Sequence, residues 1–215
     1  MHYGHLTLTE RTYQIGIKKL SSRDIHLAGI IRKWGNPPFW TLPTGFTGIV
    51  LAILSQQVSL ESARSTFCKL EQSVDSVTPE DFLSLDDTKL FGIGFSRQKA
   101  SYVRGIAEKI IAGEFELDHL ENLNNDKARE RLMEIKGIGP WTADTYLLFA
   151  LRRSDAWPSG DLALEKAVQE VEVLSRAPGK AEVDSIADRW RPWRAVAARM
   201  LWHFYLSERG RNSSV

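Results

Sequence analysis

The sequence predicts an all-α protein. Apolar residues recur at helical spacing in several segments, and capping residues, prolines and glycines mark where those segments begin and end. The sequence contains neither the alternating apolar and polar run that is typical of a strand nor a repeated strand–helix pattern. With 215 residues, the chain is long enough to bury a sizeable core in one domain or in two small lobes.

The first half of the chain predicts helices separated by short loops. Asp24 precedes a segment with apolar residues at helical spacing, and Gly35 ends that segment. Three prolines in residues 36–45 then predict a loop. The next helices are expected from Phe46 to Gln56, after a cap at Ser59, and after Thr78 with Pro79 at the first helical position.

Helices continue through the second half of the chain. A glycine turn at residues 92–94 leads into a helix that ends at Gly113, and the same letters, "GIG", recur at residues 137–139 before another helix. Further helices are expected at Asp126–Ile135, at Pro140–Arg152, and near residues 161–174 and 180–208.

Composition excludes several classes of protein. The formal net charge of +1 gives no global basic signature, so any nucleic-acid site must be local. The single cysteine, Cys68, excludes an internal disulfide and an iron–sulfur cluster with four thiolate ligands, and the five histidines show no metal-binding spacing. No signal peptide is recognised and the longest apolar stretch, residues 48–54, is too short to cross a membrane, so we expect a soluble cytoplasmic protein.

The most distinctive segment is "KGIGPWTADTY", residues 136–146, between two predicted helices. Gly137 can adopt the left-handed conformation, Gly139 leaves the backbone bare, and Pro140 suits the first helical position. Backbone N–H groups at the start of the second helix would then face solvent and could bind a phosphate, helped by the helix dipole and Lys136. The alternative is a corner between two helices that binds nothing.

Residues 135–139, "IKGIG", fit the pattern of the helix–hairpin–helix motif: a hydrophobic residue, any residue, Gly, a hydrophobic residue, Gly. The segment therefore resembles that family, in which the hairpin amides hold a DNA phosphate without reading the base sequence. Polymerases, ligases and repair nucleases share the motif, so other residues must identify the activity.

A second segment, "SDAWPSGDLALEKAV", places Asp161 after a loop with Pro and Gly and before an apolar helix, where it can also be the N-cap. A hairpin followed by such a loop and an Asp resembles the helix–hairpin–helix (HhH-GPD) DNA glycosylases. With the later "WRPWRAVAARMLWHFY", residues 28–208 look most like the bacterial 3-methyladenine DNA glycosylase II type, in a compact form without an N-terminal β-containing domain.

The resemblance implies a single glycosylase unit over residues 1–215, with two helical lobes and a DNA-binding cleft between them. One lobe is expected at residues 46–150 and contains the helix–hairpin–helix at residues 127–152. The other combines residues 1–45 with residues 151–208. DNA glycosylases of this kind remove a damaged base that has been flipped out of the duplex.

By the same resemblance, Asp161 is the catalytic carboxylate, and Asp144 and Asp155 are alternatives that do not match the family position. Bifunctional relatives have a lysine where this chain has Trp141, so we expect base removal without strand cleavage. An electron-rich indole also attracts cationic bases such as 3-methyladenine and 7-methylguanine.

The resemblance assigns further residues to the base pocket, to DNA and to a cation. The pocket is expected to include Trp141, Trp202, Phe46, Trp40 and Thr145, with core packing as the alternative for the aromatic residues. DNA contacts are expected from Lys136, Gly137, Ile138, Gly139, Thr142, Gln57 and Ser59, with Gln57 filling the gap that the flipped base leaves. The carbonyl groups of Met133, Ile135 and Ile138 would bind Na⁺ or K⁺, and no other cofactor is expected.

The expected partner is double-stranded DNA with a damaged base, bound by a monomer at the bacterial nucleoid and away from membranes. Two alternatives stay open: a glycosylase for deaminated or oxidised bases, and a non-catalytic DNA-binding module. Residues 187–211 hold six arginines and two acids, a local excess of +4. This excess predicts either a DNA-facing surface or a solvated helix face, although Arg194 could instead pair with a core carboxylate.

Overall fold

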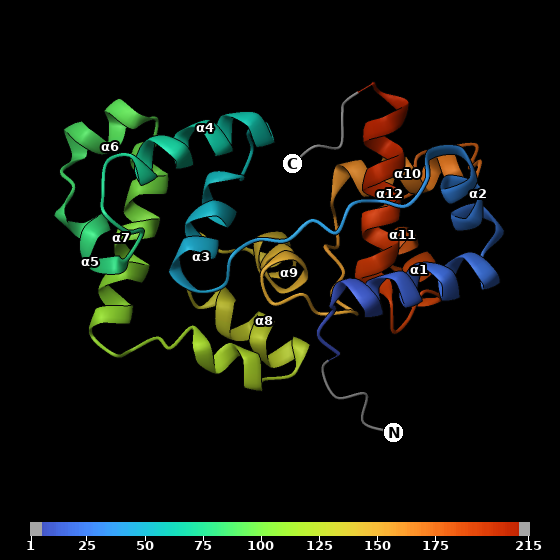
Figure 1. Cartoon of the computed structure of the whole chain (residues 1–215), viewed down its shortest axis with the longest axis horizontal. Helices are drawn as coiled ribbons and strands as arrows, with labels where there is room; N and C mark the ends of the chain where they lie inside the picture. Colours follow the sequence, from blue (N-terminus) through green and yellow to red (C-terminus); the bar gives the residue numbers. More distant parts are fainter. Residues whose placement is uncertain (1–5, 211–215) are drawn as a thin grey trace. The chain divides into compact units, whose positions relative to one another are not determined.

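The structure of the protein is a computed structural model that describes residues 6–210 (Figure 1). Over this range the chain is helical, as the sequence predicts, and the β-type pairing is a single isolated bridge between Thr7 and Arg153. The helices are α1 (Glu10–Arg23), α2 (Ile25–Trp34), α3 (Gly45–Leu54), α4 (Leu60–Glu71), α5 (Pro79–Ser84), α6 (Asp87–Ile93), α7 (Arg97–Ile111), the 3-10 helix η1 (Asp118–Asn122), α8 (Asn125–Met133), α9 (Pro140–Phe149), α10 (Leu162–Val171), α11 (Lys180–Asp188) and α12 (Arg194–Glu208).

The predicted start and stop signals act as expected at several helices. Asp24, Ser59 and Thr78 are the N-caps of α2, α4 and α5, and each side chain accepts a bond from an amide of the first turn. The stretch predicted as one helix near residues 180–208 is divided into α11 and α12, and Pro192, which has no N–H to donate, lies in the break.

The sequence reasoning did not predict α1. Thr9 caps this helix, and its hydroxyl accepts the Thr12 amide at 3.2 Å while the Thr12 hydroxyl accepts the Thr9 amide at 2.8 Å. A capping box usually carries Glu or Gln at the third helical position. Because threonine has this role here, the sequence lacks the usual signal.

The described residues form two compact units. The hairpin unit is Leu42–Tyr146, and the terminal unit combines the described residues up to Thr41 with those from Leu147 onward. The boundary therefore lies within α9. Within residues 6–210, no helix combines the length and the apolar composition that crossing a membrane requires.

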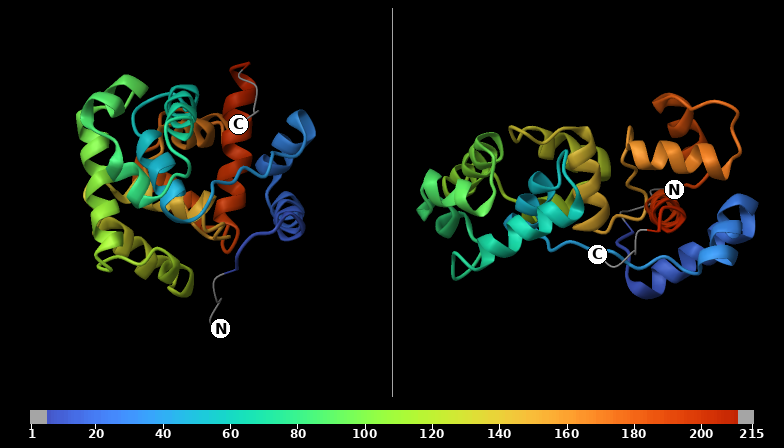
Figure 2. Two further views of the ribbon diagram at one scale, coloured as in Figure 1. Left: turned by 60° about the vertical axis from the view of Figure 1, so that its left-hand side comes forward. Right: turned by 90° about the horizontal axis from the view of Figure 1, so that it is seen from above.

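The terminal unit is built around α12. This helix packs against α1, α2, α10 and α11, and Figure 2 shows it end-on with the N-terminal helices on one side and α10 and α11 on the other. The side chains of α12 from Ala195 to Leu201 are all buried. Gly16 of α1 permits a close approach, because a Cβ there would lie 2.8 Å from the Trp193 ring and 2.9 Å from Val196.

The hairpin unit packs α3 against α4 and α7, and α7 against α5 and α6 (Figure 1). Phe82 lies at the centre of this core. Its ring makes edge contacts with Phe46 at 6.1 Å and with Phe95 at 5.5 Å between centroids. These three rings therefore join α3, α5 and the segment before α7, and they support the helix that leads to Gln57.

Candidate functional site

The predicted hairpin has the backbone geometry that its glycines suggest. Gly137 has a φ of +93°, and a Cβ there would lie 2.1 Å from the Tyr102 ring, so this position requires glycine. The Ile138 amide donates to the Ile135 carbonyl at 3.0 Å and closes the turn. Pro140 is the first residue of α9, as predicted.

The backbone is accessible where α9 begins. A Cβ built on Gly139 would meet no atom within 4 Å, and Gly139 and Pro140 are both exposed. The first N–H groups of a helix have no partner within the helix and carry the positive end of its dipole. Together these features give the turn the chemistry of a phosphate site, and Lys136 next to it is exposed.

Polar contacts attach the hairpin to its own unit. Arg129 of α8 pairs with the buried Asp144 of α9, with 2.9 Å between Nε and Oδ1, and so joins the two helices of the hairpin. The Gln56 amide donates to the Gly137 carbonyl at 2.8 Å and to the Thr142 hydroxyl at 3.0 Å. Thr142, a predicted DNA contact, therefore has a buried side chain that faces its own unit.

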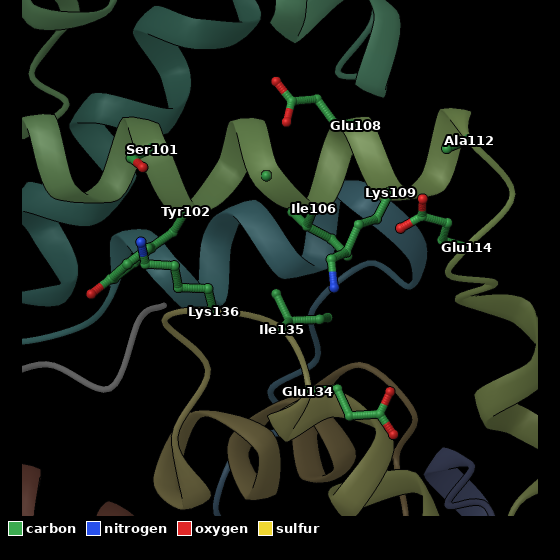
Figure 3. Close-up of a pocket in the computed structure, with 11 residues that line it drawn as sticks. Ser101, Tyr102, Ile106, Glu108, Lys109, Ala112, Glu114, Glu134, Ile135 and Lys136 are labelled. Carbon is green, nitrogen blue, oxygen red and sulfur yellow. The ribbon is translucent and has the colours of Figure 1, made fainter.

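A groove of about 420 Å³ lies beside the hairpin (Figure 3). One face of α7 forms one wall, and residues 134–136 of the turn form the other. Lys109 points from α7 toward the turn in Figure 3. The predicted residues on its walls are Ile135 and Lys136, and none of the predicted base-pocket residues lines it. This groove is therefore distinct from the predicted base pocket.

Asp161 lies in the terminal unit at the start of α10. It is the N-cap of that helix, and its Oδ1 accepts the Leu164 amide at 2.9 Å. The same oxygen accepts the Trp202 indole N–H at 3.2 Å. The carboxylate is half-buried and has a defined orientation, since donors from α10 and from α12 both fix it.

The loop before Asp161 is held in place as well. Asp184 of α11 accepts the Trp157 indole at 3.0 Å and the Ser159 hydroxyl at 2.5 Å. Gly160 has a φ of +82°, which lets the chain turn directly into the cap. These contacts position the Asp161 backbone from outside its own helix.

Trp202 is part of an aromatic stack that extends from Asp161. Its ring lies parallel to that of Phe149 within 21°, with 5.3 Å between centroids, and both side chains are half-buried. Phe149 was not predicted as a site residue. It ends the helix that begins at the hairpin, and its spacing in the sequence is also that of an ordinary core residue.

The other predicted pocket residues have different surroundings. Phe46 is in the core of the hairpin unit, and Thr145 donates its hydroxyl to the Thr142 carbonyl of its own helix at 2.9 Å. Trp40 is nearly buried in the terminal unit, and its carbonyl accepts Arg199. Trp141 is half-buried in the first turn of α9. The pocket roles of these four residues stay predictions.

Gln57 and Ser59 lie between α3 and α4. Gln57 is exposed with a φ of +56°, and Ser59 caps α4 by accepting the Ser62 amide at 3.2 Å. Their contacts with DNA stay predictions. Among the described residues, no group of three or more His, Cys, Asp or Glu side chains is placed to hold a metal ion. His2 and His5 lie outside the described residues.

The arginines near the C-terminus have structural partners. Arg194 binds Asp155 through two side-chain bonds, at 3.0 and 2.9 Å, which confirms the predicted pairing with a carboxylate. Arg191 binds the same carboxylate at 2.7 Å. Arg189 pairs with Asp24 and Glu172, Arg199 is fully buried, and Arg209 pairs with Glu170; Arg211 lies outside the described residues. Arg189 and Arg191 keep 43% and 53% of their side chains exposed beside these pairs, so the DNA-facing or solvated arginine surface stays a prediction.

The same contacts bear on the alternative carboxylates. Asp155 is bound by two arginines and Asp144 by Arg129, so both serve as partners in ion pairs. Asp161 instead accepts the Leu164 backbone amide and the Trp202 indole N–H. Of the three carboxylates, Asp161 is the one bonded to a residue of the aromatic stack, because Trp202 both donates to it and stacks on Phe149.

Comparison with known proteins identifies the family. The model of the HhH-GPD superfamily of base excision DNA repair proteins matches residues 50–192. A DNA-3-methyladenine glycosylase of Schizosaccharomyces pombe is 30% identical over 200 residues, with coverage of 86% of this chain and 88% of the relative.

Solved structures agree with this match. The S. pombe 3-methyladenine DNA glycosylase in complex with abasic DNA has a TM-score of 0.80 and 29% identity, with coverage of 87% of this chain and 94% of that chain. A DNA-3-methyladenine glycosidase from Bacillus halodurans has a TM-score of 0.77 and 28% identity, with 93% coverage of each chain. The chain therefore belongs to the HhH-GPD superfamily of base excision DNA repair proteins.

Proposed function

We propose that the protein is a monofunctional DNA glycosylase that removes alkylated purines of the 3-methyladenine and 7-methylguanine class and leaves an abasic site. The observation that carries this proposal is the Asp161 carboxylate, held by the Leu164 amide and the Trp202 indole beside the stacked Phe149 ring. The names of the relatives at 30% and 29% identity support the same substrate class.

Asp161 has the chemistry that hydrolysis of an N-glycosidic bond requires. As the bond from C1′ to the purine nitrogen breaks, its electron pair leaves with the base and positive charge develops on the sugar. A carboxylate in a fixed position stabilises that charge, or orients the water that adds to C1′ and loses a proton to the carboxylate or to solvent. The Trp202 bond fixes the carboxylate before the charge develops, so that little reorganisation is needed.

The aromatic stack and the missing lysine set the type of reaction. An N-alkylated purine carries positive charge, and an electron-rich indole face attracts such a ring by roughly 1–2 kcal/mol when water is excluded. Trp141 stands where bifunctional relatives have a lysine, and tryptophan cannot form a Schiff base with the sugar. The expected product is therefore an abasic site in an intact strand.

The hairpin is the proposed contact with the DNA backbone. A phosphate would accept N–H groups at the start of α9 near Gly139, and such contacts position the enzyme without reading sequence. The substrate is double-stranded DNA with a damaged base, and we expect a monomer to bind it in the compartment that holds the DNA.

A monovalent cation is also proposed at the hairpin. Met133, Ile135 and Ile138 offer backbone carbonyl oxygens, the type of ligand that hard cations prefer. The Ile135 carbonyl accepts the Ile138 amide at 3.0 Å and keeps a second lone pair. These residues therefore fit Na⁺ or K⁺, which would supply positive charge near the phosphate.

The experiment is base release from duplex DNA treated with a methylating agent, with the released purines identified by chromatography. We expect 3-methyladenine and 7-methylguanine in the supernatant and strand breaks only after alkali or heat. Release of deaminated or oxidised bases from lesion duplexes instead would identify a different glycosylase. Binding to abasic-analogue and intact duplexes with equal affinity, without base release, would identify a non-catalytic binding module.

A further inference from the structure

The turn between α3 and α4 has an unusual backbone. Gln57, the residue predicted to fill the gap left by a flipped base, is exposed and has a φ of +56°. The left-handed region is unfavourable for a residue with a Cβ, so the turn needs contacts that hold it there. These contacts come from Gln56, the residue before Gln57, and from Lys99, which lies 42 positions after Gln57 in the sequence.

Gln56 connects this turn to the hairpin. Its side-chain Nε2 donates to the Gly137 carbonyl at 2.8 Å and to the Thr142 hydroxyl at 3.0 Å. Both N–H donors of one amide are thus used on the two sides of the hairpin turn. The side chain of Gln56 therefore connects the backbone next to Gln57 directly with the turn of the hairpin.

Lys99 of α7 fixes the other side of the same turn. Its Nζ donates to the Leu54 carbonyl at 2.6 Å and to the Gln56 carbonyl at 2.9 Å. These carbonyls lie at and just after the end of α3, where the last C=O groups of a helix have no helical partner. The ammonium group is half-buried, and this burial lowers the pKa of Lys99.

We propose that Gln56 and Lys99 are positioning residues that hold the turn carrying Gln57 against the hairpin. The Gln57 side chain and the N-terminus of α9 then meet DNA as one preorganised surface. Neither Gln56 nor Lys99 needs to touch the base or the sugar, because they act through Gln57. This inference rests on the proposed glycosylase function and adds a geometric requirement to it.

A double-mutant cycle tests this dependence. Lys99→Met keeps the aliphatic stem and removes the two carbonyl bonds, and Gln56→Glu keeps the shape but places an acceptor against the Gly137 carbonyl. We expect each change, and Gln57→Ala, to lower single-turnover base release from methylated duplex about tenfold. Lys99→Met or Gln56→Glu combined with Gln57→Ala should stay within about twofold of Gln57→Ala alone.

Two comparisons separate this effect from loss of stability. Lys89→Met removes an exposed lysine of α6, and base release should change less than about twofold. Lys99→Arg keeps a cationic donor and should restore part of the rate. Unfolding by urea identifies a variant that no longer folds, in which case the Gln56→Glu and Gln57→Ala pair carries the test.

A double mutant whose loss equals the product of the two single losses, about a hundredfold, would show that Gln56 and Lys99 act independently of Gln57 and would overturn the proposal. Unchanged release by Lys99→Met and Gln56→Glu would overturn it as well. Failure of the proposed function has a different signature, since wild-type protein would then release no methylated purine.

Discussion

The hairpin and the C-terminal helix α12 both have many polar groups, but the two regions use them in different ways. The hairpin presents neutral backbone at Gly139 and is held by the amide of Gln56. In the terminal unit, Arg199 is fully buried and donates to the carbonyl groups of Trp40 and Leu148, at 3.0 and 2.9 Å. Its guanidinium also lies 5.2 Å from the centroid of the Phe149 ring.

The difference shows which sequence features indicate a nucleic-acid site. Four arginines in residues 187–211 pair with carboxylates within the terminal unit, and a fifth, Arg199, donates to buried carbonyl groups, so all five have partners inside the protein. The turn of the hairpin, residues 135–140, has one charged residue, Lys136, and its proposed affinity for phosphate comes mainly from backbone N–H groups and the helix dipole. The number of arginines alone therefore does not predict a DNA surface in this chain, and the phosphate contact proposed above is predicted by a short glycine pattern.

The largest expected effect separates catalysis from folding within the terminal unit. Asp161→Asn keeps an oxygen that can accept the Leu164 amide and the Trp202 indole, and Asn is as good an N-cap as Asp. Loss of the negative charge should nevertheless lower single-turnover base release by about 10²- to 10³-fold. Thermal unfolding should stay close to wild type. Undiminished release by this variant would show that another group stabilises the sugar.

The second effect tests whether the buried arginine supports the fold. Arg199→Met would leave the carbonyl groups of Trp40 and Leu148 without their guanidinium donor. The free energy of unfolding should fall by about 3 kcal/mol, measured by urea denaturation. Arg209→Met is the matched control, since its pair with Glu170 is at the surface, and it should cost less than about 1 kcal/mol. If Arg199→Met and Arg209→Met lowered the free energy of unfolding equally, the buried arginine would stabilise the fold no more than the surface arginine does.

The sequence predicts those features of the fold and of the candidate site that residues close together in the chain form. The hairpin turn, the N-cap role of Asp161 and most helix starts follow from neighbouring residues, and the structure confirms them. A pair between Arg194 and a core carboxylate was predicted only as one option, and its partner, Asp155, was not identified because it lies 39 positions away. The bonds from Gln56 and Lys99, and the stack of Phe149 on Trp202, join distant segments and leave no pattern in the sequence.

The third prediction compares the two glycines of the hairpin. Gly137→Ala places a Cβ 2.1 Å from the Tyr102 ring at a positive φ, so the free energy of unfolding should fall by about 2 kcal/mol. Gly139→Ala meets no neighbour and should leave stability within about 0.5 kcal/mol. Its methyl group should instead obstruct the phosphate and weaken binding to an abasic-analogue duplex about fivefold. Unchanged affinity of Gly139→Ala would contradict phosphate binding at this turn.

The smallest effect concerns Asp24, whose lowered pKa predicts that the stability of the terminal unit depends on pH. Burial raises the pKa of Asp24, but bonds from Trp190, Leu27 and His26 together with Arg189 outweigh this and leave the pKa below its ordinary value. A carboxyl whose pKa is lower in the folded state stabilises the protein above its unfolded pKa, about 4, and this contribution is lost as the pH falls through the folded pKa.

Asp24→Asn removes that titration and can still cap α2, because Asn is as good an N-cap as Asp. The free energy of unfolding of wild type, relative to this variant, should therefore decrease between about pH 5 and pH 2, by less than about 1 kcal/mol. Glu172 also pairs with Arg189 and is present in both proteins, so the difference between the two curves reports on Asp24. Parallel stability curves over this range would show that Arg189 and Trp190 bind the carboxyl no better than solvent does, and the terminal unit would then depend less on its ion pairs than its contacts indicate.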